Sequence, residues 1–189
     1  MPPENDPAVY LTFDDGPHPG ATPFVLKQLE SYNAKATFFC IGKCVAAHPE
    51  IYAQTVAAGH SVGNHTYNHL NGWKTSVEDY ITNITEAGSL IKSKAFRPPY
   101  GKISRAQAGM LHSATQPWTV YMWSVLSGDF DEKISAEKCL KNVLEHIAPG
   151  AIIVFHDSAK AWERLRYALP FVLDYCKEKG WAMKGLPVN

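Results

Sequence analysis

The sequence has no excess of charge of either sign, because 18 acidic side chains balance 18 basic ones. Proteins that bind nucleic acid or an anionic membrane through electrostatics carry a basic patch or a basic excess. We therefore expect neither nucleic acid nor a membrane surface as a partner. Long hydrophobic runs are also missing, and none approaches the ~18 apolar residues that cross a bilayer.

The N-terminal stretch 1–7 lacks the apolar run of a signal peptide. A strand pattern then begins at once, at Ala8. The compartment therefore stays open: the chain is cytoplasmic as it stands, or secreted if an upstream segment has been removed.

Cysteine is scarce, and its spacing excludes a zinc knuckle. Cys40 and Cys44 are too far apart for a CxxC pair, and Cys139 and Cys176 do not complete a four-cysteine site. We interpret all four as small buried apolar side chains, with a chance disulfide as the alternative. The glycine patterns GxGxxG and GxxxxGK[ST] are absent after the first strand, which argues against a dinucleotide or P-loop fold.

What is present is an alternation of short apolar runs with longer amphipathic segments. At 189 residues the chain is long enough for one domain, 1–189, with a substantial core. The predicted strands are Ala8–Phe13, Ala36–Ile41, Ser61–Asn64, Ala95–Arg97, Trp118–Trp123, Ala151–Phe155 and Trp181–Met183. The predicted helices are Thr22–Tyr32, His48–Ala58, Ser76–Lys92, Ser104–His112, Ala136–His146 and Trp162–Lys179. This order predicts an α/β fold with a mostly parallel sheet.

Polar side chains cluster at the predicted strand ends, where parallel α/β folds place their active sites. These residues are Asp14, Asp15, His65, Arg97, Asp129 and His156. Scattered surface charges would not be expected to coincide with strand ends in this way.

Asp14 and Asp15 are adjacent carboxylates that repel one another unless each finds a partner. A metal ion resolves this if one carboxylate binds it and the other remains free as a base. The alternative is an ordinary turn, which the following Gly16 and Pro17 favour.

His65 and His69 stand at positions i and i+4, which predicts that they lie on one face of a helical turn and can share an ion. This is not the HExxH pattern, because Thr66 occupies the glutamate position. Two histidines and one carboxylate form a ligand set with room for water. The alternative is simple packing of two histidines.

The segment 97–101, Arg-Pro-Pro-Tyr-Gly, predicts a rigid loop, because its prolines restrict the backbone and lack N–H groups. The amides of Tyr100 and Gly101 could then face a developing oxyanion, and Arg97 could clamp a carboxylate. His156 ends an apolar run, where a catalytic acid would belong, with a carboxylate to raise its pKa. The alternatives are a structural loop and a buried histidine.

In this order and spacing, TFDDGP, HTYNH, RPPYG, GDF and VFHD resemble the polysaccharide deacetylase family, which is carbohydrate esterase family 4 with the NodB homology domain. The match runs from Asp14 to Asp157. The resemblance implies a distorted (β/α) barrel with about seven mostly parallel strands. It also implies an acetylated carbohydrate as substrate.

The resemblance further implies a role for each motif residue. The metal ligands would be Asp15, His65 and His69, binding one divalent ion, usually Zn²⁺, with Co²⁺, Ni²⁺ or Mn²⁺ as alternatives. The catalytic group would be Asp14 as base, His156 as acid, Arg97 holding Asp14 and Asp129 tuning His156. The oxyanion and substrate residues would be Tyr100, through its amide, with Pro99 and Phe130 in the groove.

Three positions depart from the family pattern. The fourth motif usually reads Asp-x-x-Asp-Trp, but Leu126 replaces the first Asp and Phe130 replaces the Trp. Val154 stands where the last motif usually has Leu. The smaller wall at residue 130 leaves the identity of the substrate open.

We expect removal of N-acetyl groups from an N-acetylglucosamine polymer such as peptidoglycan or chitin, by a monomer. The same machinery would serve an O-acetyl esterase on xylan or a small-amide hydrolase. An Fe(II) oxygenase with two histidines and one carboxylate is a different class. It commonly uses an all-β scaffold and leaves Asp14 and His156 without a role. A sugar-binding module without catalysis is the non-enzymatic alternative.

Overall fold

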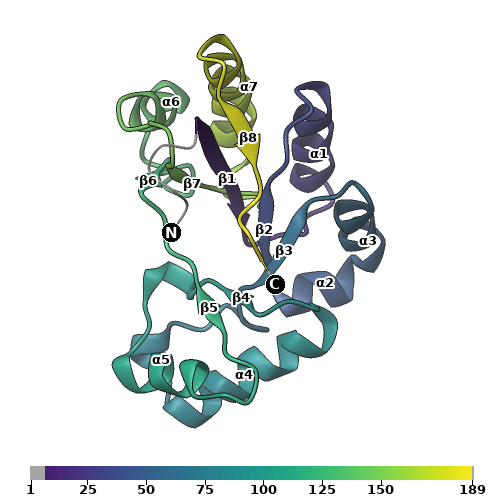
Figure 1. Ribbon diagram of the computed structural model, residues 1–189, viewed down its shortest axis with the longest axis vertical. Helices are drawn as coiled ribbons and strands as arrows, with labels where there is room; N and C mark the ends of the chain where they lie inside the picture. Colours follow the sequence, from purple (N-terminus) through teal and green to yellow (C-terminus); the bar gives the residue numbers. More distant parts are fainter. Residues whose placement is uncertain (1–6, 189) are drawn as a thin grey trace.

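The computed structural model describes residues 7–188 and contains one parallel sheet with seven helices around it (Figure 1). The strands are β1 (Ala8–Asp14), β2 (Thr37–Cys40), β3 (Ser61–Asn64), β4 (Ala95–Phe96), β5 (Thr119–Val120), β6 (Val125–Leu126), β7 (Ile152–His156) and β8 (Ala182–Lys184). Their order is β5-β4-β3-β2-β1-β7-β6, and every pairing is parallel. β8 pairs with the first half of β1, and β2 pairs with its second half.

The helices lie outside the curled sheet, as in a barrel (Figure 1). They are α1 (Ala21–Ser31), α2 (Gly42–Ala47), α3 (Pro49–Ala57), α4 (Val77–Leu90), α5 (Arg105–His112), α6 (Ala136–Leu144) and α7 (Trp162–Glu178). Short 3₁₀ turns occupy Gly72–Lys74 and Pro99–Gly101. Ordinary capping chemistry occurs at both a helix start and a helix end. At the start of α4 the Ser76 side chain accepts from the Asp79 amide, and after the end of α7 Gly180 has a φ of 67°.

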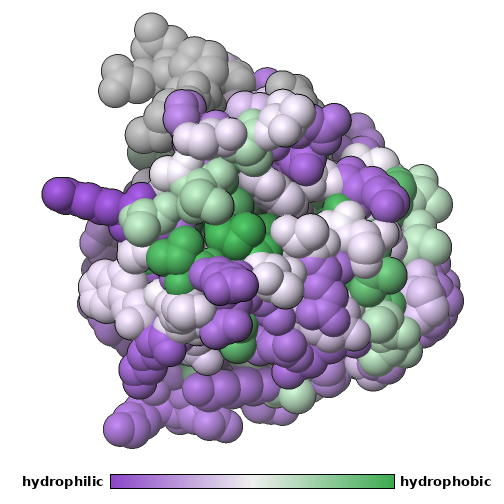
Figure 2. Space-filling view, turned by 90° about the horizontal axis from the view of Figure 1, so that it is seen from below, coloured by the Kyte–Doolittle hydropathy of each residue, from purple (hydrophilic) through white to green (hydrophobic). Residues whose placement is uncertain are grey.

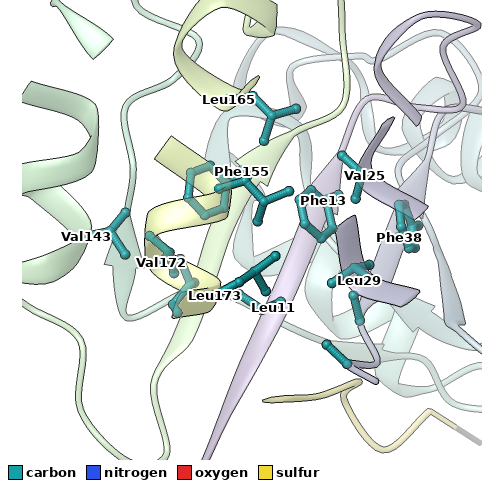
Figure 3. Close-up of a cluster of buried hydrophobic side chains, with 14 of the residues drawn as sticks. Leu11, Phe13, Val25, Leu29, Phe38, Val143, Phe155, Leu165, Val172 and Leu173 are labelled. Carbon is teal, nitrogen blue, oxygen red and sulfur yellow. The ribbon is translucent and has the colours of Figure 1, made fainter. Parts of the chain in front are cut away.

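The main core lies between the sheet and the helices α1, α6 and α7 (Figure 3). β1 is buried along its whole length, so its alternating side chains fill two different spaces. Leu11 and Phe13 point to the helices, where Phe13 stacks on Phe38 of β2 and Phe155 of β7. The other face of β1 lines the inside of the curled sheet.

The inside of the sheet has a smaller apolar cluster and one buried cation. Tyr10, Phe39 and Ile152 form part of that cluster. Arg97, which follows β4, is fully buried with its guanidinium over the Phe39 ring. A buried arginine inside a small barrel requires polar partners, and these lie at the carboxyl ends of the strands.

The predicted fold class, a distorted (β/α) barrel of mostly parallel strands, is confirmed. Details differ where tertiary contacts decide. The predicted strand Trp118–Trp123 is reduced to β5, and the chain then forms the separate two-residue strand β6, which pairs with β7. α2 was not predicted as a helix.

The surface carries both hydrophilic and hydrophobic residues, as expected for a protein in contact with water. On the face in Figure 2, hydrophobic residues form small groups among hydrophilic ones. Within residues 7–188, no helix combines the length and the hydrophobicity required to cross a bilayer.

Candidate active site

Asp14 ends β1 with its side chain buried inside the curled sheet. Nη1 of Arg97 lies 2.8 Å from Oδ1 of Asp14. The guanidinium also donates to the Thr12 hydroxyl at 2.7 Å and to the carbonyls of Tyr121 and Met122. Burial lowers the pKa of Arg97, and Asp14 opposes that change. The network fixes the Asp14 carboxylate in one orientation.

Asp15 lies directly after β1, with a backbone φ of 80° that non-glycine residues rarely adopt. One carboxylate oxygen, Oδ1, lies 3.2 Å from Nε2 of His69 and 3.6 Å from Nε2 of His65. This oxygen is buried and has no hydrogen-bond partner among the described residues. Burial opposes ionisation of Asp15, but His69, His156 and His65 together hold its pKa well below the ordinary value.

His65 is held with one ring nitrogen free. Its Nδ1 lies 2.7 Å from the Arg97 carbonyl, so Nδ1 carries the proton and donates. Burial lowers the pKa of His65 to about 4, so the ring is neutral near pH 7. The lone pair of Nε2 is therefore directed towards Asp15. Nδ1 of His69 lies 3.1 Å from the Tyr100 hydroxyl.

The prediction that His65 and His69 share a helical turn is wrong. The segment is an irregular loop in which Thr66 and His69 have φ values of 62° and 58°. Side chains outside the segment hold this shape: Asn83 Oδ1 accepts from the amides of Tyr67 and Asn68, and Asn64 Oδ1 accepts from Thr66. These hydrogen bonds replace those of a helix, so the two rings converge by loop geometry.

Asp15, His65 and His69 offer ligand atoms that all lie within 4.8 Å of one another. The unpartnered oxygen of Asp15 and the fixed tautomer of His65 are what a cation-binding group requires. One carboxylate and two imidazoles suit a borderline divalent ion and leave positions for water or substrate. The residues present therefore fit a divalent metal ion.

His156 ends β7 and is the register partner of Asp14 on β1, so the two residues lie on neighbouring strands at one level. Its Nδ1 lies 2.7 Å from Oδ1 of Asp129, and its amide donates to the other carboxylate oxygen at 2.7 Å. Burial favours the neutral ring, but the charge and hydrogen bond of Asp129 outweigh it and raise the pKa of His156 to about 9. His156 is therefore a proton donor near pH 7.

The loop after β4 turns at Tyr100, which has φ 60°. The Gly101 amide donates to the Pro98 carbonyl, so it is not available to a ligand, and Pro99 has no N–H. Tyr100 is therefore the residue of this loop that can offer an amide. Its side chain is exposed and packs edge-on against the His69 ring at 4.6 Å.

These groups surround a pocket of about 340 Å³. Its lining comprises Asp14, Asp15, His65, His69, Tyr100, Trp123, Leu126, Phe130, Val154, His156 and Lys160. Phe130 packs edge-on against His156, with ring centroids 5.2 Å apart. A polar floor with apolar walls is typical of a small-molecule or sugar site.

A second, more open cleft of about 550 Å³ shares Asp15 and His69 with the pocket. His18, Lys43 and His48 contribute to its lining. His18 and His48 lie in loops, and Lys43 lies in α2. The pocket and the cleft meet at Asp15 and His69, so together they form a longer depression.

All the predicted site residues except Pro99 line the pocket or form a hydrogen bond with a residue that lines it. Arg97 and Asp129 lie behind the pocket and contact Asp14 and His156, whereas Pro99 is buried and does not line it. Trp123 and Lys160 were not predicted as site residues. Trp123 is the last residue of the predicted strand Trp118–Trp123, which is a weak signal, and no signal marks Lys160.

Comparisons with known proteins show the family to which the chain is similar. A family model described as polysaccharide deacetylase matches residues 2–116. The chitooligosaccharide deacetylase of Azorhizobium caulinodans is 32% identical over 203 residues, which cover 97% of this chain and 95% of that protein. A peptidoglycan-N-acetylglucosamine deacetylase of Bacillus cereus is 32% identical over 184 residues, covering 95% of this chain and 86% of that protein.

The fold is shared as well. The solved structure of the Bc1960 peptidoglycan N-acetylglucosamine deacetylase matches with a TM-score of 0.89 and 34% identity, covering 98% of this chain and 88% of that one. The two relatives and the solved structure match nearly the whole chain, and the family model matches residues 2–116. The chain belongs to the polysaccharide deacetylase family.

Proposed function

We propose that this protein hydrolyses N-acetyl groups of an N-acetylglucosamine-containing polysaccharide, using Zn²⁺ held by Asp15, His65 and His69. The observation that carries the proposal is the pairing of Asp14 and His156 as register partners beside that ligand group. Amide hydrolysis requires a base for water and an acid for the leaving nitrogen. This pocket has one candidate for each.

A divalent cation at Asp15, His65 and His69 would polarise the acetyl carbonyl and lower the pKa of water. The choice of Zn²⁺ rests on the donor set, since imidazole and carboxylate in a small open site suit zinc. Co²⁺, Ni²⁺ and Mn²⁺ are the alternatives that reconstitution would distinguish.

Asp14 takes a proton from the attacking water as the new C–O bond forms. Arg97 keeps the carboxylate pointed into the pocket, because three other hydrogen bonds fix the Arg97 side chain. The Tyr100 amide donates to the carbonyl oxygen as negative charge develops there.

His156 donates its proton to the amide nitrogen as the C–N bond breaks, giving acetate and a free amine. The raised pKa ensures that the ring carries this proton near neutral pH. Asp129 occupies Nδ1, so the other nitrogen is the one available to substrate.

The polymeric substrate is supported by the two hollows that meet at Asp15 and His69. A sugar chain has neighbours on both sides of the reacting unit, and a cleft that continues past the ligand group would accommodate them. The exposed rings of Phe130 and Tyr100 offer apolar faces for the C–H face of a pyranose. The relatives named for chitooligosaccharides and for peptidoglycan agree with this class.

The test is acetate release from N-acetylglucosamine oligomers and from O-acetylated xylan, using chelator-stripped and zinc-restored protein side by side. Zinc-dependent acetate from the oligomers is the expected result. Equal release with and without zinc would refute the metal mechanism. Zinc-dependent release from xylan alone would refute the N-acetyl substrate but would still support the proposed catalytic residues and metal.

A further inference from the structure

Asp157 follows His156, but its side chain turns away from the pocket and is fully buried. Its Oδ1 accepts a hydrogen bond from the Gly16 amide at 3.1 Å, and its Oδ2 accepts from the Thr22 hydroxyl at 2.5 Å. Its own amide donates to the Asp14 carbonyl at 3.0 Å. Burial raises the pKa of Asp157 to about 8, although the hydrogen bonds from the Thr22 hydroxyl and the Gly16 amide oppose that change.

Two of these contacts are with the residues on either side of Asp15 in the sequence. The carbonyl of Asp14, before it, accepts a hydrogen bond from the Asp157 amide. The amide of Gly16, after it, donates a hydrogen bond to the Asp157 side chain. Asp15 itself has φ 80°, a conformation that surrounding contacts must maintain. Asp157 supplies two of those contacts.

The fit at Gly16 shows how closely the carboxylate approaches the loop. A Cβ placed on Gly16 would overlap the Asp157 carboxylate group. Glycine is therefore required at this position by the contact itself. Thr22 completes the support, since its hydroxyl also accepts from the His18 amide at the other end of the turn.

We propose that Asp157 is a positioning residue that holds Asp15 in its metal-binding orientation. It does so through the Gly16 amide and the Asp14 carbonyl. Because Asp157 directly follows His156, it also connects the end of β7, which carries the proposed acid, to the loop after β1, which carries Asp15. This inference rests on the proposed function, in that Asp15 binds a metal ion.

The test compares zinc affinity, by competition with a chromophoric chelator, in wild type, Asp157→Ala and Asp157→Asn. Asp157→Ala removes the acceptor for Gly16, and we expect zinc affinity to fall by about 10- to 100-fold, as for other outer partners of metal ligands. Asp157→Asn retains an oxygen acceptor for Gly16, so it should restore most of the affinity. The visible spectrum of the Co²⁺ form should change in the alanine variant and recover in the asparagine variant.

The control is Val172→Ala, which shortens a buried apolar side chain of α7 in the main core. It should lower stability but leave zinc affinity and the Co²⁺ spectrum unchanged, which separates positioning from general destabilisation. If Asp157→Ala does not fold, Thr22→Val decides instead, since it removes one of the two bonds to the carboxylate. Thr22→Val should lower zinc affinity less than Asp157→Ala would.

Wild-type zinc affinity in folded Asp157→Ala, or in Thr22→Val where that variant decides, would overturn the inference. A loss in Asp157→Asn as large as in Asp157→Ala would overturn it as well, because the acceptor is retained there. The readout is binding and not turnover. A chain that binds zinc but releases no acetate would therefore refute the proposed substrate while the comparison of affinities still decides the role of Asp157.

Discussion

The guanidinium of Arg97 and the carboxylate of Asp14 form a fully buried ion pair, with 2.8 Å between Nη1 and Oδ1. Removal of one partner of a buried pair leaves an uncompensated charge, which costs about 3–5 kcal/mol. We expect Arg97→Met to lower the free energy of unfolding by that amount and to reduce turnover. Urea unfolding measures the first effect, with the exposed Arg105→Met as control. An unchanged unfolding midpoint in Arg97→Met would contradict this account.

Mutation should distinguish the proposed roles of Asp14 and Asp15. Asp14→Asn should lower kcat by about 10²- to 10⁴-fold, the usual value of a general base, while zinc stays bound. Asp15→Asn should release zinc, because it removes the carboxylate ligand. Metal content after dialysis and acetate release give both answers. Loss of zinc from Asp14→Asn would mean that the two roles are exchanged.

His156 should titrate with a pKa of about 9 in chelator-stripped protein, followed by NMR of the imidazole ring. Asp129→Asn should lower that pKa, because burial then acts with less opposition. Since the folded-state pKa lies above the ordinary 6.5, the pair stabilises the folded chain below pH 6.5. That contribution is lost as the pH rises through about 9. A pKa that does not respond to Asp129→Asn would show that Asp129 is not the cause.

Tyr100 should act through its backbone and not through its hydroxyl. Tyr100→Phe removes the contact between the hydroxyl and Nδ1 of His69 but retains the amide. We expect kcat to stay within about threefold of wild type, whereas loss of a true oxyanion donor costs about 10²–10³ in kcat. Steady-state kinetics on N-acetylglucosamine oligomers with saturating zinc decide this. A hundredfold loss in Tyr100→Phe would assign the donor to the hydroxyl.

The sequence allowed prediction of the site residues where their position depends on a strand end. Asp14 and His156 directly end apolar runs, and the carboxyl ends of parallel strands meet at one edge of a sheet. The loop that presents His65 and His69 was not predictable, because Asn83 of α4, a separate element, accepts hydrogen bonds from two of its amides. Spacing alone suggested a helical turn there.

Short elements limited prediction of the fold. β6 has two residues, Val125 and Leu126, and exists because it pairs with β7, so no local pattern marks it. Asp157 carried a motif position but no visible role, since its partners Gly16 and Thr22 are more than a hundred residues away. Tertiary hydrogen bonds of this kind leave no periodic trace in the sequence.

The direction of β1 and β8 has a practical consequence for attachment. The described chain enters at Pro7, just before β1, and β8 pairs in parallel with the first residues of the same strand. Pro7 thus lies at the opposite end of β1 from Asp14, and the Leu186 amide donates to the Thr37 hydroxyl at the start of β2, which is the same end of the sheet. Attachment of a bead, a surface or a reporter beside Pro7 or Leu186 should therefore leave the cleft open to large insoluble substrates.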